Sequence, residues 1–268
     1  SLMGLITPEL KLAALLGRPK LSKAQVETTN TLISTVSLNK FHNLIERHRI
    51  WPCVYYNLRD YFPDLLSEAS FSYLMKRYQQ NTRQSQRSFD TCGKLLKGFK
   101  DLNVEVKVLK GLPLAFKLYG DISKRHSKDI DLIIKKVDLE AAHTVLTRFG
   151  FQCSQFEQLT ERQKSFYYNS HKDITYYDKA STVIELHVRL AYQKTKLSDQ
   201  YLQQLFMENS ISDNNTIELI YLCWHGSHTL FHRLKWLVDI TLYIEQKIQP
   251  CNEDLVNVAG RLGAIRPL

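Results

Sequence analysis

Several features that define common protein classes are missing from this sequence of 268 residues. No apolar run is long enough to cross a bilayer, and the opening SLMGLITPEL lacks the basic and long apolar regions of a secretory signal. No internal repeat and no low-complexity stretch is present. Because 44% of the residues are hydrophobic, we expect a cytoplasmic globular protein without a membrane partner.

Cysteine is too sparse and too irregularly spaced to indicate a cross-linked fold. The five cysteines are Cys53, Cys92, Cys153, Cys223 and Cys251. An odd number at wide spacing fits neither a disulfide framework nor a zinc site. We expect buried free thiols in a reducing compartment.

The sequence also lacks any block of five or more like charges, although its overall balance is basic. Lysine and arginine total 36 against 27 acids, a formal net charge of +9. Such an excess favours anionic partners, namely nucleotides, polyphosphates or nucleic acid. The alternative is an ordinary solvated surface, so nucleic-acid binding stays open.

The spacing of apolar residues divides the chain into three regions. Helical spacing predominates in residues 1–99, where Ser22 is a candidate N-cap and one long helix is predicted over 67–99. Alternating patterns predict strands in 100–195, and helical spacing returns in 196–268. We therefore expect an α+β fold in which a small mixed sheet is flanked by N- and C-terminal helical regions. The ending GRLGAIRPL has no clear helix cap, which leaves open that the natural chain continues.

The middle region alternates strands with helices. Strands are predicted at VEVKVL and DIDLIIK. Helices are predicted at GLPLAFKLYG, with Pro113 near its start and Gly120 past its end, and at VDLEAAHTVLTRFGF, between Asp138 and Gly150. KDITYYD and TVIELHVRL, joined by a short turn at Lys179–Ser181, predict an antiparallel hairpin.

Two aspartates interrupt the strand DIDLIIK. Residues two apart share a face of a strand, so Asp129 and Asp131 project together, opposite the apolar face that we assign to the core. Adjacent carboxylates repel unless a cation lies between them, and oxygen ligands of this kind suit Mg²⁺. Glu185, in the strand VIELHV, is the candidate third carboxylate, which would permit a second ion.

Context, rather than spacing, distinguishes this pair from the other acid-x-acid pair of the chain. Chance alone predicts about as many such pairs as the sequence contains. Asp138 and Glu140 open a predicted helix, where acids favour the helix dipole, so we assign them a structural role. Acids inside a β pattern are disfavoured and need another reason.

A lysine–glycine pair precedes the aspartates, where a strand passes into a helix. Free backbone N–H groups at such a junction attract an anion, and Gly111 would let a phosphate approach the main chain. Lys110 adds a positive charge beside it. The alternative is an ordinary turn glycine.

These parts together resemble an uncharacterised nucleotidyltransferase family of the DNA polymerase-β-type superfamily. The superfamily signature is a strand ending in glycine, a helix, a strand bearing acid-x-acid, and a third acid on a later strand. The resemblance is strongest over Val106 to Ile134 and continues through Glu185 to Val188. It is weaker in HGSHTLFHRLKWLVDI.

The resemblance implies a role for each acidic residue. Asp129 and Asp131 would bind the catalytic Mg²⁺ ions, two in number, that also hold the nucleoside triphosphate. Glu185 would complete a metal site near the acceptor hydroxyl, as ligand or base. The products would be a nucleotidylated acceptor and pyrophosphate.

The resemblance also implies the phosphate contacts. Gly111, with Lys110 beside it, would contact the β- and γ-phosphates. Arg125 would neutralise phosphate, the alternative being an exposed loop charge. Leu112 departs from the superfamily, which usually has serine after the glycine, so the phosphate contact of that serine is lost.

Further polar residues are candidates for accessory roles. His187 shares a strand face with Glu185 and would orient an acceptor or a metal-bound water, unless it is an ordinary hydrogen-bonded histidine. One helix is predicted over 216–246, and on it three histidines share a polar face with Lys235 and Asp239. We expect that face to line the acceptor cleft.

The sequence thus predicts a Mg²⁺-dependent nucleotidyltransferase that uses a nucleoside triphosphate. Its acceptor is a small molecule, a sugar, a protein or an RNA end. One alternative is a non-catalytic nucleotide-sensing or protein-binding relative with the same fold. A weaker one is a basic RNA- or DNA-binding protein, whose affinity would depend steeply on salt.

Overall fold

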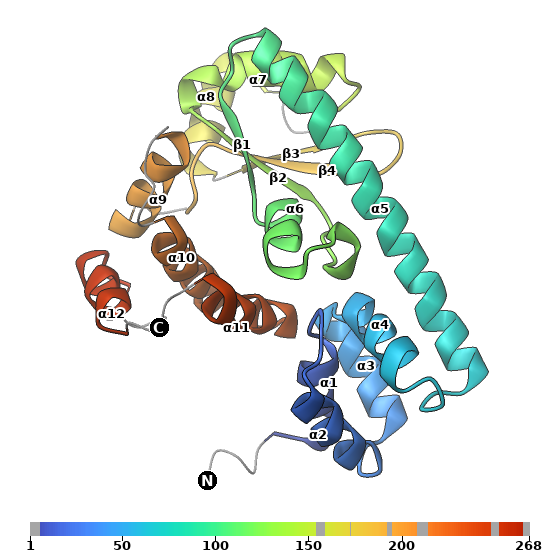
Figure 1. Cartoon of the computed structure of the whole chain (residues 1–268). Coiled ribbons are helices and arrows are strands. Elements are labelled where there is room, and N and C mark those ends of the chain that lie inside the picture. The colour runs from blue at the N-terminus through green and yellow to red at the C-terminus, as the bar shows by residue number, and fades with distance from the viewer. Residues whose placement is uncertain are drawn as a thin grey trace. The chain divides into compact units, whose positions relative to one another are not determined.

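The structure, a computed structural model, describes most of the chain. The described residues are 6–153, 159–171, 173–191, 195–207, 214–247 and 252–264. They form the expected α+β fold, with many helices and one four-stranded sheet (Figure 1).

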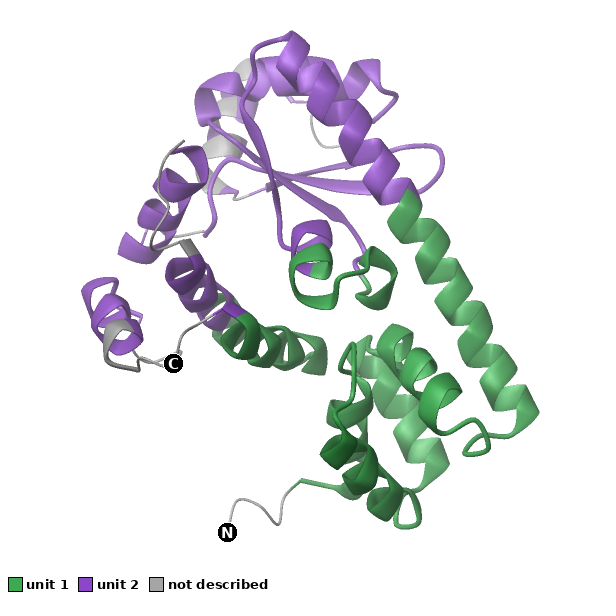
Figure 2. Cartoon of the chain, viewed as in Figure 1, with its two compact units in different colours: residues 1–86, 115–126, 225–246 green, residues 87–114, 127–224, 247–268 purple. Residues whose placement is uncertain are grey.

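The chain divides into two compact units, each assembled from separate segments (Figure 2). Unit 1 comprises residues 1–86, 115–126 and 225–246, and unit 2 comprises residues 87–114, 127–224 and 247–268. The two units are defined by contacts rather than by order along the chain. The division of the sequence into three consecutive regions stays a prediction.

Unit 1 is helical. It contains α1 (Pro8–Leu16), α2 (Lys23–Ile33), α3 (Leu38–His48), α4 (Trp51–Tyr61), the first part of α5 (Glu68–Asp101), a π-helical turn (Ala115–Tyr119), a 3-10 turn (Ile122–Lys124) and most of α11 (Leu234–Lys247). The predicted cap at Ser22 is confirmed, because its hydroxyl accepts from Gln25 N while the Gln25 side chain accepts from Ser22 N. The long helix predicted over 67–99 is α5.

Unit 2 contains the sheet, with strand order β1-β2-β4-β3. The strands are β1 (Val106–Leu109), β2 (Ile130–Ile134), β3 (Asp173–Tyr177) and β4 (Val183–His187). β3 and β4 pair antiparallel, which confirms the predicted hairpin, and β1 pairs antiparallel with β2. β2 and β4 are parallel neighbours, so the strand that bears Asp131 lies beside the strand that bears Glu185.

Helices of unit 2 cover both faces of the sheet. On one face, Leu132 and Leu186 pack with Phe99 of α5 and Leu146 of α7 (Leu139–Arg148). Ile133, on the face of Asp131, is also fully buried, among residues of α9 (Lys196–Phe206), α10 (Asn214–His228) and α12 (Asn252–Arg261). The sheet therefore has two apolar layers, whereas alternation in the sequence predicted one. The remaining elements of this unit are α6 (Gly111–Leu114), a 3-10 turn (Lys136–Asp138) and α8 (Glu161–Ser170).

The single helix predicted over 216–246 is wrong, because the chain turns between α10 and α11. Leu230 and Phe231 have left-handed backbone, with φ of 51° and 45°, and Phe231 N donates to Gly226 O. A Cβ atom on Gly226 would lie 2.1 Å from the Phe231 ring, so only glycine lets the ring fold back here. His225 and His228 consequently lie on a different helix from Lys235 and Asp239.

The predicted thiols are confirmed where the structure describes them. Cys53, Cys92, Cys153 and Cys223 are buried and form no disulfide, and Cys251 lies outside the described residues. Among the helices that are described, none combines the length and the apolar character that crossing a membrane requires.

Candidate metal and phosphate site

The register of β2 and β4 brings two carboxylates together in unit 2. Asp131 lies directly opposite Glu185 in the parallel pair, and neighbouring strands of a sheet lie about 4.8 Å apart. Asp131 is 8% exposed and Glu185 is half-buried. Carboxylates this close raise each other's proton affinity unless a positive charge compensates them.

His187 joins the two carboxylates. Its ring is 3% exposed, Nε2 donates to Asp131 Oδ1 at 3.0 Å, and Nε2 is 3.7 Å from Glu185 Oε2. One ligand atom from each of Asp131, Glu185 and His187 lies within 4.8 Å of the other two. We call these three residues the acidic cluster.

The acidic cluster fits a divalent cation. Carboxylate oxygens suit Mg²⁺ or Mn²⁺, and an imidazole nitrogen suits transition metals. In the arrangement described, His187 Nε2 carries the proton that Asp131 accepts, so His187 orients this carboxylate. Its Nδ1 is buried, 3.9 Å from Asp173 Oδ2, and has no hydrogen-bond partner in the described part of the chain.

Asp129 lies outside the acidic cluster. It is half-buried and precedes β2, and its carbonyl oxygen accepts from Ser127 Oγ at 3.1 Å. The aspartate pair of the sequence is therefore divided between the strand and the segment before it. Metal binding by Asp129 stays a prediction.

Lys110 places an ammonium group near the acidic cluster. It follows Leu109, the β1 partner of Asp131, and has left-handed backbone with φ of 43°, which is strained for a residue with a Cβ. Its Nζ lies 5.5 Å from the centre of the Tyr221 ring. Burial lowers the pKa of Lys110, but Tyr221, Asp131 and Glu185 outweigh it and raise the pKa overall. Lys110 therefore stays charged beside the acids.

Gly111 lies where the chain closely approaches itself. A Cβ at this position would lie 2.7 Å from Ser127 Oγ, so the hydroxyl occupies the space that a side chain would need. The helix predicted to follow is only the four residues of α6, continued by the π-helical turn. Such a short helix has a small dipole, so any phosphate contact here depends on Lys110 and on local N–H groups.

Arg125, predicted to contact phosphate, lies in unit 1 and is buried against Asp239. Its Nε and Nη2 donate to the two carboxylate oxygens of Asp239 at 2.9 and 2.8 Å, and the two residues are 6% and 2% exposed. The Tyr119 hydroxyl donates to the same carboxylate at 2.8 Å. Burial, and next the Asp239 charge, raise the pKa of Tyr119, which keeps this donor protonated. The alternative interpretation of Arg125 as an exposed loop charge is therefore wrong, because its guanidinium is half of a buried ion pair.

Lys235, which like Asp239 was predicted to have an accessory role, contacts the backbone of unit 1. Its Nζ donates to the carbonyl oxygen of His126 at 3.1 Å. The roles that the sequence predicts for Arg125, Lys235 and Asp239 toward substrate stay predictions.

Sequence reasoning assigned no role to Ser127 or Tyr221, which adjoin Gly111 and Lys110. Tyr221 belongs to an apolar helical pattern and stacks on Tyr201, with 4.6 Å between ring centres. The contact of Tyr221 with Lys110 joins residues more than a hundred positions apart, and nothing in local spacing indicates it. A set of metal ligands chosen from acidic residues alone includes Asp129 and omits His187, whereas the structure brings His187 into the acidic cluster.

Comparison with known proteins agrees with this geometry. The model of a family described as uncharacterised nucleotidyltransferase matches residues 34–268, and so includes the acidic cluster and the Lys110-Gly111 junction. No curated protein and no solved structure matches the chain. Since the match extends over most of the sequence, the chain belongs to this uncharacterised nucleotidyltransferase family.

Proposed function

We propose that the protein transfers a nucleoside monophosphate from a nucleoside triphosphate to an acceptor hydroxyl and releases pyrophosphate. The observation that carries the proposal is the convergence of Asp131, Glu185 and His187 in a chain of a nucleotidyltransferase family. The acceptor oxygen forms a bond to the α-phosphorus, and the bond from that phosphorus to the α–β bridging oxygen breaks.

Asp131 and Glu185 would hold divalent ions, for which we expect Mg²⁺, with Asp129 as a further ligand. A bound ion supplies positive charge that orients the triphosphate and stabilises the leaving pyrophosphate. His187 holds the Asp131 carboxylate in place through its Nε2–H donor. Glu185 is the more exposed carboxylate of the acidic cluster, so it could also accept the proton that the acceptor hydroxyl loses.

Lys110 would bind the β- and γ-phosphates. Its ammonium is already held near the acids by the strained backbone and by Tyr221. A fixed positive charge next to a metal site stabilises the charge of a leaving pyrophosphate without further reorganisation. The lysine would thereby supply the contact that Leu112 does not make.

Calorimetric titration of ATP tests the metal assignment. We expect Mg²⁺-dependent ATP binding by the parent chain and no detectable binding by the variant Asp129→Ala/Asp131→Ala. The matched control is Asp138→Ala/Glu140→Ala, which removes the other acid-x-acid pair of unit 2 and should bind as the parent does. Circular dichroism checks that both variants fold. Equal ATP affinity in the two double variants would show the metal assignment to be wrong.

Transfer itself is tested with labelled triphosphates. The protein, Mg²⁺ and each labelled triphosphate are incubated in a cell extract, and the molecule that acquires label is identified. We expect Glu185→Gln to bind ATP and to lose transfer, since the amide removes a charge and a proton acceptor. Undiminished labelling by Glu185→Gln would mean that a residue other than Glu185 supplies the third carboxylate. Binding without labelling by the parent would identify the non-catalytic alternative.

A further inference from the structure

Three arginines of unit 1 lie where α3 ends and α11 begins. Arg47 is in the last turn of α3, Arg49 directly follows that helix, and Arg233 directly precedes α11. The Arg233 guanidinium donates from Nη1 to the carbonyl oxygen of Arg47, and Leu234 N donates to His48 Nδ1 at 3.0 Å. These two contacts hold the two segments together. We call Arg47, Arg49 and Arg233 the arginine cluster.

No acid compensates the arginine cluster within the described part of the chain. None of its three guanidinium groups forms an ion pair there, although Arg47 is exposed and the other two are half-buried. Glu46, the neighbour of Arg47 in the sequence, pairs with Arg77 at 2.9 Å. Asp239 of α11 pairs with Arg125 at 2.8 Å. The carboxylates closest along the chain are therefore already engaged.

The electrostatics of the arginine cluster show this lack of compensation. Burial, and next the charges of Arg49 and Arg47, lower the pKa of Arg233. Burial, and next the charges of Arg47 and Arg233, lower the pKa of His48. Arg49 also has left-handed backbone with φ of 57°, which glycine or asparagine adopts at less cost after a helix. An arginine held at a strained position beside two others favours an anionic ligand.

A fourth cation extends the arginine cluster along α3. Lys40 and Arg47 are seven residues apart, so they share a face of the helix and are separated by about 10 Å of helical rise. Both line a pocket of about 340 Å³, in which Glu9 is the single acid among the described lining residues. Glu9 is buried, and its carboxylate accepts from Ser37 N at 3.0 Å. The cations therefore extend over a distance that one phosphate group does not span.

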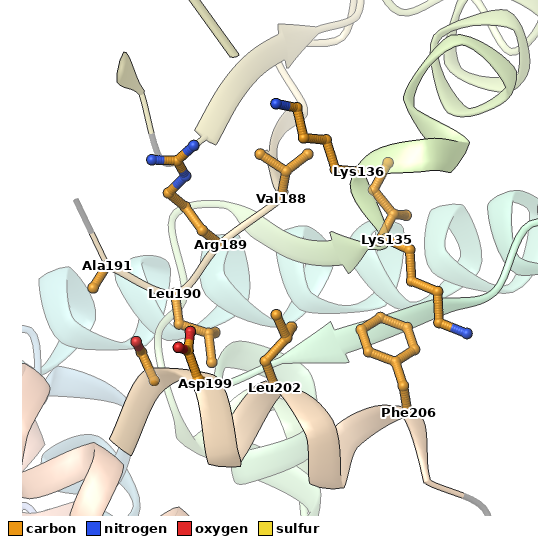
Figure 3. Close-up of a pocket in the computed structure, with 11 residues that line it drawn as sticks. Lys135, Lys136, Val188, Arg189, Leu190, Ala191, Asp199, Leu202 and Phe206 are labelled. Carbon is orange, nitrogen blue, oxygen red and sulfur yellow. The ribbon is translucent and has the colours of Figure 1, made fainter. Parts of the chain in front are cut away.

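The cations that line a pocket of unit 2 are accompanied by acids. Lys135, Lys136 and Arg189 line this pocket of about 430 Å³, and so does Asp199 (Figure 3). Lys135 Nζ is also 2.8 Å from Glu105 Oε2. That pocket thus has charges of both signs, whereas the arginine cluster has charge of one sign.

We propose that the arginine cluster, together with Lys40, binds successive phosphate groups of a nucleic-acid strand. The planar guanidinium offers two parallel donors to a phosphate. Cations spread along a helix and across to a second one suit a ligand with several phosphates in a row. The net charge of +9 attracts such a polyanion. This site goes beyond the proposed nucleotidyl transfer, since it needs neither a metal ion nor a triphosphate, and each proposal can fail without the other.

Fluorescence anisotropy of a labelled oligouridylate tests this assignment, with the full chain and without Mg²⁺ or nucleoside triphosphate. We expect Arg47→Gln/Arg49→Gln/Arg233→Gln to weaken binding about tenfold or more at low salt. Each lost phosphate contact reduces the dependence of log affinity on log salt by about 0.7, so three contacts reduce it by about 2. Circular dichroism checks that the variant folds. Absence of oligouridylate binding by the parent chain would overturn the proposal.

A second triple variant separates the arginine cluster from net charge. Lys11→Gln/Lys20→Gln/Lys23→Gln removes the same charge from exposed positions of unit 1, and we expect it to bind the oligouridylate within about twofold of the parent. An equal loss in the two triple variants would overturn the proposal. Vesicles of phosphatidylglycerol offer phosphate from another source. A chain that binds these vesicles through the arginine cluster, and binds the oligouridylate without it, would also overturn the proposal.

A measurement on the unmodified chain keeps the proposal falsifiable if a variant fails to fold. Phenylglyoxal modifies accessible arginines, and mass mapping of peptides follows each of them. We expect the oligouridylate to slow modification of Arg47 several-fold and to leave Arg83, an exposed arginine of α5 in unit 1, unchanged. Inorganic phosphate at the same total phosphate concentration should protect Arg47 less. Equal protection of Arg47 and Arg83, or equal protection of Arg47 by inorganic phosphate, would overturn the assignment.

Discussion

Each unit contains a buried aspartate, and the two are compensated in different ways. In unit 1, Asp239 accepts three hydrogen bonds from the Arg125 guanidinium and one from the Tyr119 hydroxyl. In unit 2, Asp131 has a second carboxylate opposite it in the sheet, that of Glu185, and accepts from His187.

The difference distinguishes an aspartate that stabilises the fold from one that belongs to the candidate metal site. The carboxylate of Asp239 meets one fixed, always charged arginine in a planar, bidentate geometry, and no further ion is needed. In the acidic cluster two carboxylates converge, and Lys110 is the cation whose pKa their charges raise. The second arrangement therefore offers two carboxylates to a divalent ion, whereas in the first arrangement the carboxylate is already neutralised by Arg125.

The largest predicted effect is a loss of folding stability when the Arg125–Asp239 pair of unit 1 is broken. Asp239→Asn leaves the Arg125 charge buried without its carboxylate, so we expect a loss of about 3–5 kcal/mol in the free energy of unfolding. Asp131→Asn removes one of two repelling carboxylates and should change stability by about 1 kcal/mol or less. Urea unfolding followed by circular dichroism measures both.

A double variant provides the control for this comparison. Arg125→Met/Asp239→Leu replaces the buried pair by apolar side chains and should recover most of the stability that Asp239→Asn loses. If Asp131→Asn destabilised the chain as much as Asp239→Asn, the two aspartates would have the same structural role and the contrast would be lost.

The second prediction concerns the pH dependence of unit 1. Burial, and next the charge of Lys235, lower the pKa of His126 to about 3, and its Nδ1 donates to Asn81 Oδ1 at 2.8 Å. In the unfolded chain the His126 ring takes up a second proton, and becomes charged, near pH 6.5, whereas in the folded chain it stays neutral at that pH. The contribution of neutral His126 is therefore complete above pH 6.5 and is lost as the pH falls toward 3.

Urea unfolding between pH 4 and pH 7 measures this effect. One proton corresponds to at most about 1.4 kcal/mol per pH unit, and to less here because the ring is partly exposed. His126→Gln should flatten the dependence, whereas His171→Gln, at an exposed position of unit 2, should not. A profile that His126→Gln leaves unchanged would show that this histidine is not held neutral by the fold.

The parts of this comparison that sequence predicts are local ones. The hairpin of β3 and β4, the helix α5 and the Ser22 cap depend on neighbouring residues, and each is confirmed. The resemblance implied that Glu185 completes a metal site with the aspartates, and the parallel pairing of β2 with β4, which alternation alone does not predict, places it opposite Asp131.

The parts that sequence missed depend on contacts between distant residues. Arg125 reads as a loop charge until α11 brings Asp239 to it, 114 positions along the chain. The break before α11 depends on the Phe231 ring folding onto Gly226, which helical periodicity does not encode. The burial of Ile133 likewise requires helices that arrive later in the chain.

The smallest predicted effect compares two glycines of unit 2, one beside the acidic cluster and one remote from it. Among the described residues, no atom beyond its chain neighbours and the backbone of its own helix lies within 4 Å of a Cβ built on Gly93, in the interior of α5. Gly93→Ala should therefore stabilise the chain by about 0.5–1 kcal/mol and leave ATP binding unchanged. Gly111→Ala displaces the Ser127 hydroxyl, which can rotate, so we expect only about 1 kcal/mol of destabilisation. Because Ser127 also contacts Asp129, the same change should weaken ATP binding several-fold in calorimetry. Equal ATP affinity in the two variants would mean that the close approach at Gly111 serves the fold alone, as the Arg125–Asp239 pair does in unit 1.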